Sequence, residues 1–285
     1  MKTLSKFFNR VCTQKYKVFG FVRCSSFYAR IKGDIIQTFY LKHSQYVPSC
    51  TVTFGIIPLC LPQPHFLSAG AYELDKFVVE LHKYSSLWTF DPDSDESMEK
   101  CIKSLTNAID MYLIPFFDRC YDCKSALEEL IKLEELFEEN RQKILQLIGG
   151  SDMAAPWYER SLFDYKKYYM ALKSHNLIYA HQYLIHQINS HKRRLEEFDN
   201  PNFPEQPDCV RERCLAGLKQ NMEQLDWIES GDFGKFDDML NNNEKQMYEF
   251  LSIKHSKILK KGDIGPISGA FINGATESII SNILR

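Results

Sequence analysis

Apolar and polar residues alternate along the stretch from residue 20 to residue 57, and this alternation predicts adjacent antiparallel strands. The last strand shows the pattern best. Its apolar positions are Cys50, Val52, Phe54 and Ile56. A second strand is predicted over 35–43, after Gly33, because glycine suits a tight hairpin. A first strand is predicted over roughly 21–31, with an irregularity at Ser25-Ser26.

One polar residue interrupts the apolar face of the second predicted strand. Gln37 lies on the same side as Ile35, Phe39 and Leu41, where its amide needs hydrogen-bond partners if it is buried. We interpret it as a core glutamine bonded to the backbone of a neighbouring loop. The alternative is an amide that faces a ligand on an open face of the sheet.

Helical periodicity is found on both sides of the sheet. A helix over about 3–14 places four apolar residues on one stripe and has a basic face, which we interpret as solvated. The alternative is a helix that lies on a membrane surface. The second half of the chain is predicted to be mostly helical. The expected helices are 97–113, a short one from Pro115, 124–148, 156–172, one ending near 198, 209–229 and 236–260.

Breaks between these helices divide the chain. Gly149-Gly150 ends one helix, 199–208 holds three prolines and is the best linker, and the stretch 58–70 is a predicted surface loop. The apolar positions of the helix over 209–229 are Leu215, Leu218, Met222 and Leu225. The tail after Gly262 ends in an apolar stripe that either docks on the protein or offers a partner site.

Motifs in the first half follow one another in a recognisable order. They are Gly20-Phe21, Phe27-Tyr28-Ala29-Arg30, Gly33-Asp34-Ile35-Ile36-Gln37 and Cys50-Thr51-Val52-Thr53-Phe54-Gly55-Ile56, followed by Trp88 and Pro115-Phe116-Phe117. This succession resembles the bacterial domain-of-unknown-function family 4304. The resemblance implies an α+β fold, a fourth strand over 73–84 that could otherwise be a helix, and no known activity. It carries over no catalytic residue.

A second, local resemblance covers 157–198. Tyr169-Met170-Ala171-Leu172, Tyr179-Ala180 and Tyr183-Leu184 resemble a single tetratricopeptide-type helix pair, in which small Ala180 would lie where the two helices approach closely. Only one such unit is found, and a stable array needs about three.

Composition narrows the class of protein. With 285 residues, 44% of them hydrophobic, the chain is long enough for a large core in one domain or two. A formal net charge of −2 gives no general attraction to nucleic acid or to an anionic membrane. Because no signal peptide is visible and nine cysteines are scattered, we expect a cytoplasmic protein with reduced thiols.

The candidate chemistry is sparse. Cys120 and Cys123 form a CxxC pair, but Cys209 and Cys214 make a poor second pair for zinc. Asp91, Asp93, Asp95 and Glu96 depart from a calcium loop and are interpreted as capping a helix. Lys192-Arg193-Arg194 is a short basic cluster at a helix end. We therefore nominate no catalytic, cofactor-binding or metal-binding residue.

The sequence predicts an α+β fold. A small antiparallel sheet of three to four strands, residues about 20–84, packs with an N-terminal helix and precedes a mostly helical C-terminal half. We predict an α+β domain over 1–150 and a helical region over 151–285. The favoured function is a non-enzymatic protein-interaction module, for example an antidote that covers a toxin. The alternative is an enzyme or small-molecule binder with a pocket between sheet and helices, near Gln37 and Trp88.

Overall fold

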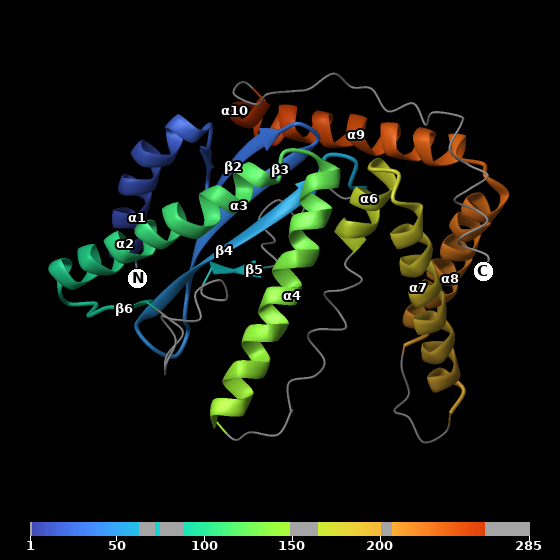
Figure 1. Ribbon diagram of the computed structural model, residues 1–285, viewed down its shortest axis with the longest axis horizontal. Coiled ribbons are helices and arrows are strands. Elements are labelled where there is room, and N and C mark those ends of the chain that lie inside the picture. Colours follow the sequence, from blue (N-terminus) through green and yellow to red (C-terminus); the bar gives the residue numbers. More distant parts are fainter. Residues whose placement is uncertain (1, 63–71, 75–87, 149–164, 201–206, 260–285) are drawn as a thin grey trace. The chain divides into compact units, whose positions relative to one another are not determined.

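The computed structural model describes residues 2–62, 72–74, 88–148, 165–200 and 207–259 (Figure 1). It confirms the α+β class, with an antiparallel sheet of six strands, an N-terminal helix and a mostly helical C-terminal half. The chain divides into two compact units. The first comprises Met1–Leu162 and Asn243–Pro266, and the second comprises Phe163–Asn242 and Ile267–Arg285.

The sheet of the first unit has the strand order β1-β2-β3-β4-β5, and β6 also pairs with β4. Its strands are β1 Val22–Cys24, β2 Phe27–Lys32, β3 Ile35–His43, β4 Ser49–Pro58, β5 Tyr72–Glu73 and β6 Trp88–Thr89. The central pair runs in register from Ile35 opposite Pro58 to His43 opposite Cys50. Gly33 occupies the tight turn between β2 and β3 with a φ of +58°, as its position in the sequence predicts.

The prediction of one continuous first strand over 21–31 is wrong. The irregularity expected at Ser25-Ser26 is a hairpin turn, which separates β1 from β2 and pairs Cys24 with Phe27. Ser25 adopts a φ of +58°, which reverses the chain direction. The fourth strand predicted over 73–84 lies mostly outside the described residues. Next to that range, β5 and β6 each pair with a different part of β4, at Thr53–Phe54 and at Ser49–Cys50.

Helices of the first unit contact one face of the sheet. Helix α1, Lys2–Lys15, contacts this face where Phe8 packs edge-on against Tyr28 of β2. The short 3-10 helix η1, Tyr16–Phe19, adds Tyr16 against Phe39 of β3. Helix α3, Ile114–Arg119, reaches the same face through aromatic contacts. These are Phe117 with Phe21 and both Phe116 and Phe117 with Phe54.

The predicted helix over 97–113 begins earlier and continues further than its pattern indicates. Helix α2, Asp95–Ala108, begins after Ser94, whose hydroxyl accepts a hydrogen bond from the Ser97 amide. The cap is therefore a serine instead of a carboxylate, while Asp95 and Glu96 lie in the first turn, where they suit the helix dipole. The helix passes through the π-helical turn η5, Ile109–Leu113, directly into α3.

Pro115 explains that π-helical turn. Proline has no amide hydrogen to donate to the preceding turn, and a π-bulge lets the helix continue past the missing bond. The short helix predicted from Pro115 is thus joined to α2. Helix α4, Cys123–Ile148, follows and confirms the prediction over 124–148 within one residue.

The second unit contains a helical hairpin and part of α9. Its helices are α6 Tyr165–Lys173, α7 Leu177–Phe198, α8 Asp208–Ser230 and the first half of α9 Gly234–Lys254. Ala180 is fully buried, and Tyr168 of α6 stacks on Tyr183 of α7. This geometry confirms the predicted helical hairpin from Tyr165 onward, while 156–164 lies outside the described residues.

Helices α7 and α8 lie side by side and run antiparallel (Figure 1). His191 near the end of α7 contacts Cys214 near the start of α8, and His181 reaches Glu229 near the end of α8. The last helix, α10 Ser256–Leu259, belongs to the first unit, where it contacts β1 and β2. Among the helices described, none combines the length and the apolar character that a membrane span requires.

Candidate functional site

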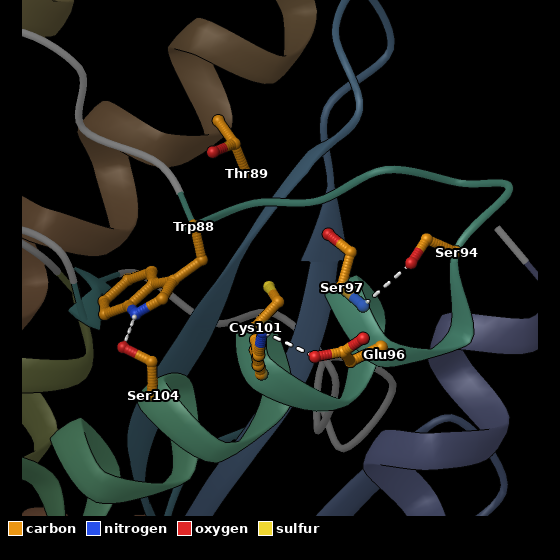
Figure 2. A pocket seen from close by; sticks show the side chains of 8 residues that line it. Trp88, Thr89, Ser94, Glu96, Ser97, Cys101 and Ser104 are labelled. Atoms are coloured by element: carbon orange, nitrogen blue, oxygen red, sulfur yellow. Dashed lines mark hydrogen bonds and ion pairs between the residues drawn. The ribbon is translucent and has the colours of Figure 1, made fainter.

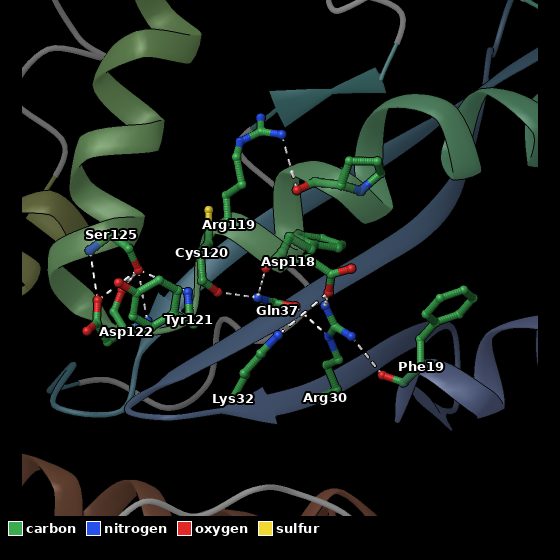
Figure 3. A network of polar contacts seen from close by, with 12 residues as sticks. Phe19, Arg30, Lys32, Gln37, Asp118, Arg119, Cys120, Tyr121, Asp122 and Ser125 are labelled. Carbon is green, nitrogen blue, oxygen red and sulfur yellow. Dashed lines mark hydrogen bonds and ion pairs between the residues drawn. The ribbon is translucent and has the colours of Figure 1, made fainter.

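A buried polar network joins the sheet to the end of α3 (Figure 3). The amide of Gln37, which is fully buried, donates to the backbone oxygens of Phe117 and Cys120, at 2.6 Å each. Its side-chain oxygen accepts a 2.6 Å hydrogen bond from Nε of Arg30. The prediction of a core glutamine bonded to backbone is confirmed, but the acceptors lie in α3 and at its C-cap instead of in a loop.

Arg30 is the residue of this network that sequence reasoning missed. Its remaining donors reach the carbonyl oxygen of Phe19 at 2.8 Å and the Asp118 carboxylate at 2.7 Å. The guanidinium also lies 4.6 Å from the centre of the Phe21 ring. Arginine presents donors in a fixed planar fork, so one side chain can bind three groups on three different elements. The network therefore fastens α3 and η1 to the sheet, and each of the three guanidinium nitrogens donates to a group of the fold.

A shallow pocket of about 490 Å³ lies between β6 and α2 (Figure 2). It is lined by Trp88, Thr89, Ser94, Glu96, Ser97, Lys100, Cys101 and Ser104. Trp88 donates through its indole nitrogen to the Ser104 hydroxyl at 3.2 Å, and Glu96 forms a 2.7 Å ion pair with Lys100. Of the two residues named for a pocket between sheet and helices, Trp88 lines this pocket and Gln37 does not.

Two thiols meet beneath this pocket. Sγ of Cys101 lies 3.7 Å from Sγ of Cys50, and both residues are buried. The hydrogen bond from Cys50 lowers the pKa of Cys101, while the same hydrogen bond and burial raise the pKa of Cys50. Cys101 is thus the sulfur of this pair that ionises more readily, and it is also the one that lines the pocket.

The CxxC pair does not form one site in the structure. Cys123 is buried against Cys60 and Asp34, and burial is the first cause that raises its pKa. Cys120 has its pKa raised by burial too, but its charged neighbours are Glu129, Arg119, Arg30 and Lys32. Cys214, which with Cys209 makes a poor second pair by spacing, is hydrogen-bonded to His191 in the second unit. In the described part of the chain, no three metal-binding side chains come together.

A smaller hollow of about 260 Å³ lies beside the turn between β3 and β4. Its lining includes His43 and Ser49, whose Nδ1 and Oγ atoms are buried and have no hydrogen-bond partner among the described residues. The other imidazole nitrogen of His43 lies 2.9 Å from the Ser5 hydroxyl. Burial lowers the pKa of His43, which favours the neutral ring. A buried polar atom without a partner is costly.

The second unit exposes an apolar face on the antiparallel pair of helices α7 and α8, which is called the α7–α8 hairpin below. Four large side chains of this face are exposed: Ile178 at 52%, Ile185 at 38%, Leu215 at 48% and Met222 at 51%. Leu218, between Leu215 and Met222 on α8, and Leu225, three positions after Met222, are half-buried. Together these six residues are called the apolar face below.

The apolar face points away from α6. Tyr168 of α6 stacks on Tyr183 of α7 and donates to Gln224 of α8 at 3.1 Å, so α6 covers one side of the hairpin. Ile185 follows Tyr183 by two positions and Met222 precedes Gln224 by two, and two residues are about 200° around a helix. Ile185 and Met222 therefore lie together on the uncovered side.

The apolar positions that the sequence marks on α8 are not the positions that the structure buries. The sequence pattern marks Leu215, Leu218, Met222 and Leu225, yet the buried residues of α8 are Cys214, Gln224 and Ile228. An uninterrupted apolar stripe at helical spacing is typical of a core face, and an exposed one is typical of an interaction surface. The signal was thus present in the sequence, but only the structure shows which side faces solvent.

Comparisons with family models, curated proteins and solved structures each found no match to this chain.

Proposed function

We propose that this chain is a protein-interaction module whose contact surface is the apolar face of α7 and α8. The observation that carries the proposal is the exposure of Ile178, Ile185, Leu215 and Met222 on one side of a single helical hairpin. Scattered exposed apolar residues are ordinary, whereas a contiguous stripe bounded by polar residues marks a contact surface. A rigid pair of helices also presents such a stripe with little loss of entropy on binding.

The polar chemistry of the first unit supports the same reading. Gln37, which is fully buried, directs its hydrogen bonds to the fold, and Arg30 is shared among three partners. The pocket at Trp88 is lined mainly by hydroxyl groups and by an exposed Glu96–Lys100 pair, which solvent screens. The resemblance to the family of unknown function remains a prediction and adds no activity.

The test compares wild type with the double variant Ile185→Glu/Met222→Glu after gentle purification. We expect native mass spectrometry to show a stoichiometric protein complex for wild type and its loss for the variant. The matched control is Ile253→Glu, because Ile253 is exposed at 77% but lies on α9 in the first unit. A complex that survives the double variant, or that is lost equally with the control, would contradict the proposal.

A second candidate function is the binding of a small polar molecule in the hollow at His43 and Ser49. The specific observation is that two residues lining one hollow, His43 and Ser49, each carry a buried polar atom for which the described residues supply no hydrogen-bond partner. Native mass spectrometry on the same sample tests it through a stoichiometric small adduct. The variant Ser49→Ala should abolish that adduct. Ser44→Ala serves as the control, because Ser44 lines the same hollow but its hydroxyl is not buried without a hydrogen-bond partner.

A further inference from the structure

Cys50 of β4 and Cys101 of α2 bring two thiols together from distant parts of the chain. Their Sγ atoms lie 3.7 Å apart, and both residues are buried. A disulfide has a sulfur–sulfur distance of about 2.05 Å, so bridging requires the two atoms to approach by roughly 1.6 Å. Rotation of the side chains about their Cα–Cβ bonds moves the sulfurs on this scale. The two thiols are therefore close enough to be joined by side-chain movement.

The two sulfurs differ in their access to solvent. Cys101 is 6% exposed and lines the pocket between β6 and α2 (Figure 2), whereas Cys50 is fully buried. Cys50 lies opposite Trp88 where β4 pairs with β6, so it is covered by the strand that borders the pocket. Cysteines that only fill the core need no such access. A more accessible thiol beside a buried one is typical of a redox pair, in which the first sulfur is attacked and the second resolves it.

The ionisation of the pair follows the same order. The hydrogen bond from Cys50 lowers the pKa of Cys101, which increases the fraction of thiolate at the pocket. The pKa of Cys50 is raised first by this hydrogen bond and then by burial. The thiolate is the reactive form of cysteine, so Cys101 is the sulfur that meets an oxidant first.

The lining of the pocket restricts which oxidant fits. Its charged residues Glu96 and Lys100 form a 2.7 Å ion pair, so their charges offset each other. Four of the other lining residues carry hydroxyl groups, namely Thr89, Ser94, Ser97 and Ser104. A hydroxyl-lined pocket without a net charge suits a small uncharged polar molecule, and the low exposure of Cys101 disfavours a bulky one. A small hydroperoxide meets both conditions.

We propose that Cys50 and Cys101 form a reversible disulfide when a small hydroperoxide reaches Cys101 through the pocket beside Trp88. The bond would tie α2 covalently to β4 and close a loop of the chain that carries β5 and β6. This inference is independent of the proposed function, because the three residues lie in the first unit and the apolar face lies in the second.

The reaction proceeds in two balanced steps. The Cys101 thiolate attacks one peroxide oxygen and the oxygen–oxygen bond breaks, which leaves a sulfenic acid on Cys101 and releases water or an alcohol after protonation. Sγ of Cys50 then attacks the sulfenic sulfur, the sulfur–oxygen bond breaks, and the hydroxide leaves as water with the proton of Cys50. The two thiols together lose two electrons, and the peroxide gains them.

The first step prepares the second. A sulfenic acid on Cys101 carries no negative charge, so the hydrogen bond to a thiolate that holds the proton on Cys50 is lost. Burial is then the main remaining cause that raises the pKa of Cys50. Because the two sulfurs are already neighbours, condensation to the disulfide competes well with further oxidation of Cys101.

Cys60 and Cys123 provide an internal comparison. They are hydrogen-bonded to each other, and they are exposed by only 0% and 1%. Neither residue lines the pocket beside Trp88, and burial is the first cause that raises the pKa of Cys123. This second pair has the proximity of the first without its access, so it should remain reduced under the same treatment.

Peptide mapping by mass spectrometry tests the proposal on the full chain. Cys209→Ser removes the exposed thiol, and the reduced protein is then treated with hydrogen peroxide and digested without reductant. A link between Cys50 and Cys101 should form at least about tenfold faster than one between Cys60 and Cys123, and dithiothreitol should reverse it. Absence of the first link, or its formation no faster than the second, would overturn the inference and leave two thiols that only pack.

Two further variants test the route through Cys101. In Cys50→Ala the resolving thiol is gone, so peroxide should leave a sulfenic acid on Cys101 that dimedone traps. In Cys101→Ala the remaining thiol of Cys50 is fully buried and should stay unlabelled. Alanine is chosen because it buries no unpaired polar group, and circular dichroism checks that both variants fold. Labelling of Cys101 that does not exceed that of Cys50 would overturn the entry of the oxidant through the pocket.

Discussion

At the scale of single residues, Gln37 shows how one buried amide can hold two elements together. It bonds two backbone oxygens at the end of α3 and receives the Arg30 donor, while no part of its side chain reaches solvent. Gln37→Leu keeps the approximate volume but removes the amide donors to the Phe117 and Cys120 carbonyl oxygens and the acceptor of Arg30 Nε. We expect the free energy of unfolding to fall by about 2–4 kcal/mol.

Urea denaturation followed by circular dichroism measures that loss. Gln45→Leu is the control, because Gln45 is an exposed glutamine in the turn between β3 and β4, and its substitution should change stability by less than about 0.5 kcal/mol. Equal midpoints for the two variants would show that the network contributes nothing to stability.

The cysteines give a second prediction at this scale. Eight of the nine thiols are buried and Cys209 is exposed. Burial raises the pKa of Cys12 and Cys120 above the usual range and that of Cys24 to about 11, so these thiols stay protonated and unreactive at neutral pH. A chromogenic disulfide reagent at pH 7.5 should titrate one thiol rapidly in the native protein.

Cys209→Ser should remove that fast reaction, and full unfolding should expose the remaining cysteines. Cys101 should be the next thiol to react, because its pKa is lowered by Cys50 and it lines the pocket beside Trp88. Rapid reaction of several thiols in the folded Cys209→Ser variant would contradict the buried arrangement.

At the scale of elements, the turn between β2 and β3 packs against the residues at the start of α4. Gly33 has a φ of +58°, and a Cβ at this position would overlap the carbonyl oxygen of Tyr121. The next residue, Asp34, accepts a 2.8 Å hydrogen bond from the amide of Cys123, the first residue of α4. The hairpin therefore supplies the cap that this helix start needs.

Gly33→Ala should destabilise the protein by more than about 2 kcal/mol, because it adds backbone strain to a clash with main-chain atoms. Gly234→Ala is the matched control, since a Cβ there meets nothing within 4 Å, and it should be neutral or slightly stabilising. Thermal unfolding of both variants decides the matter. A tolerated Gly33→Ala would mean that the turn and α4 are not in contact.

Elements also show what the sequence could and could not predict. A two-residue turn at Gly33-Asp34 pairs Lys32 with Ile35, and the same register pairs Arg30 with Gln37. The partner of the buried amide was therefore predictable from the hairpin alone. The exposed stripe on α8 was not, because periodicity identifies a face without saying what covers it. That Ser25-Ser26 is a hairpin turn depends on pairing between strands, which local propensity does not determine.

At the scale of the whole molecule, histidines in both units share one response to pH. Burial lowers the pKa of His43 and His255 in the first unit and of His191 in the second. A lowered pKa means that the unfolded chain takes up a proton more readily than the folded chain. Their contribution is therefore complete above the ordinary histidine pKa of about 6.5 and is lost as the pH falls below it.

We expect the free energy of unfolding to stay nearly level from pH 7.5 to about pH 6.5 and to fall from there to pH 5.5. One fully titrating group changes stability by at most about 1.4 kcal/mol per pH unit, and partial exposure of these rings makes each share smaller. His255 offers a clean variant, because its ring packs between Phe27 and Phe250, with centres 5.6 Å apart in each case. His255→Phe keeps a ring there and removes the titrating group, so it should flatten the slope. Urea midpoints that stay level or rise on acidification would show that these imidazoles are as easily protonated in the folded protein as in the unfolded chain.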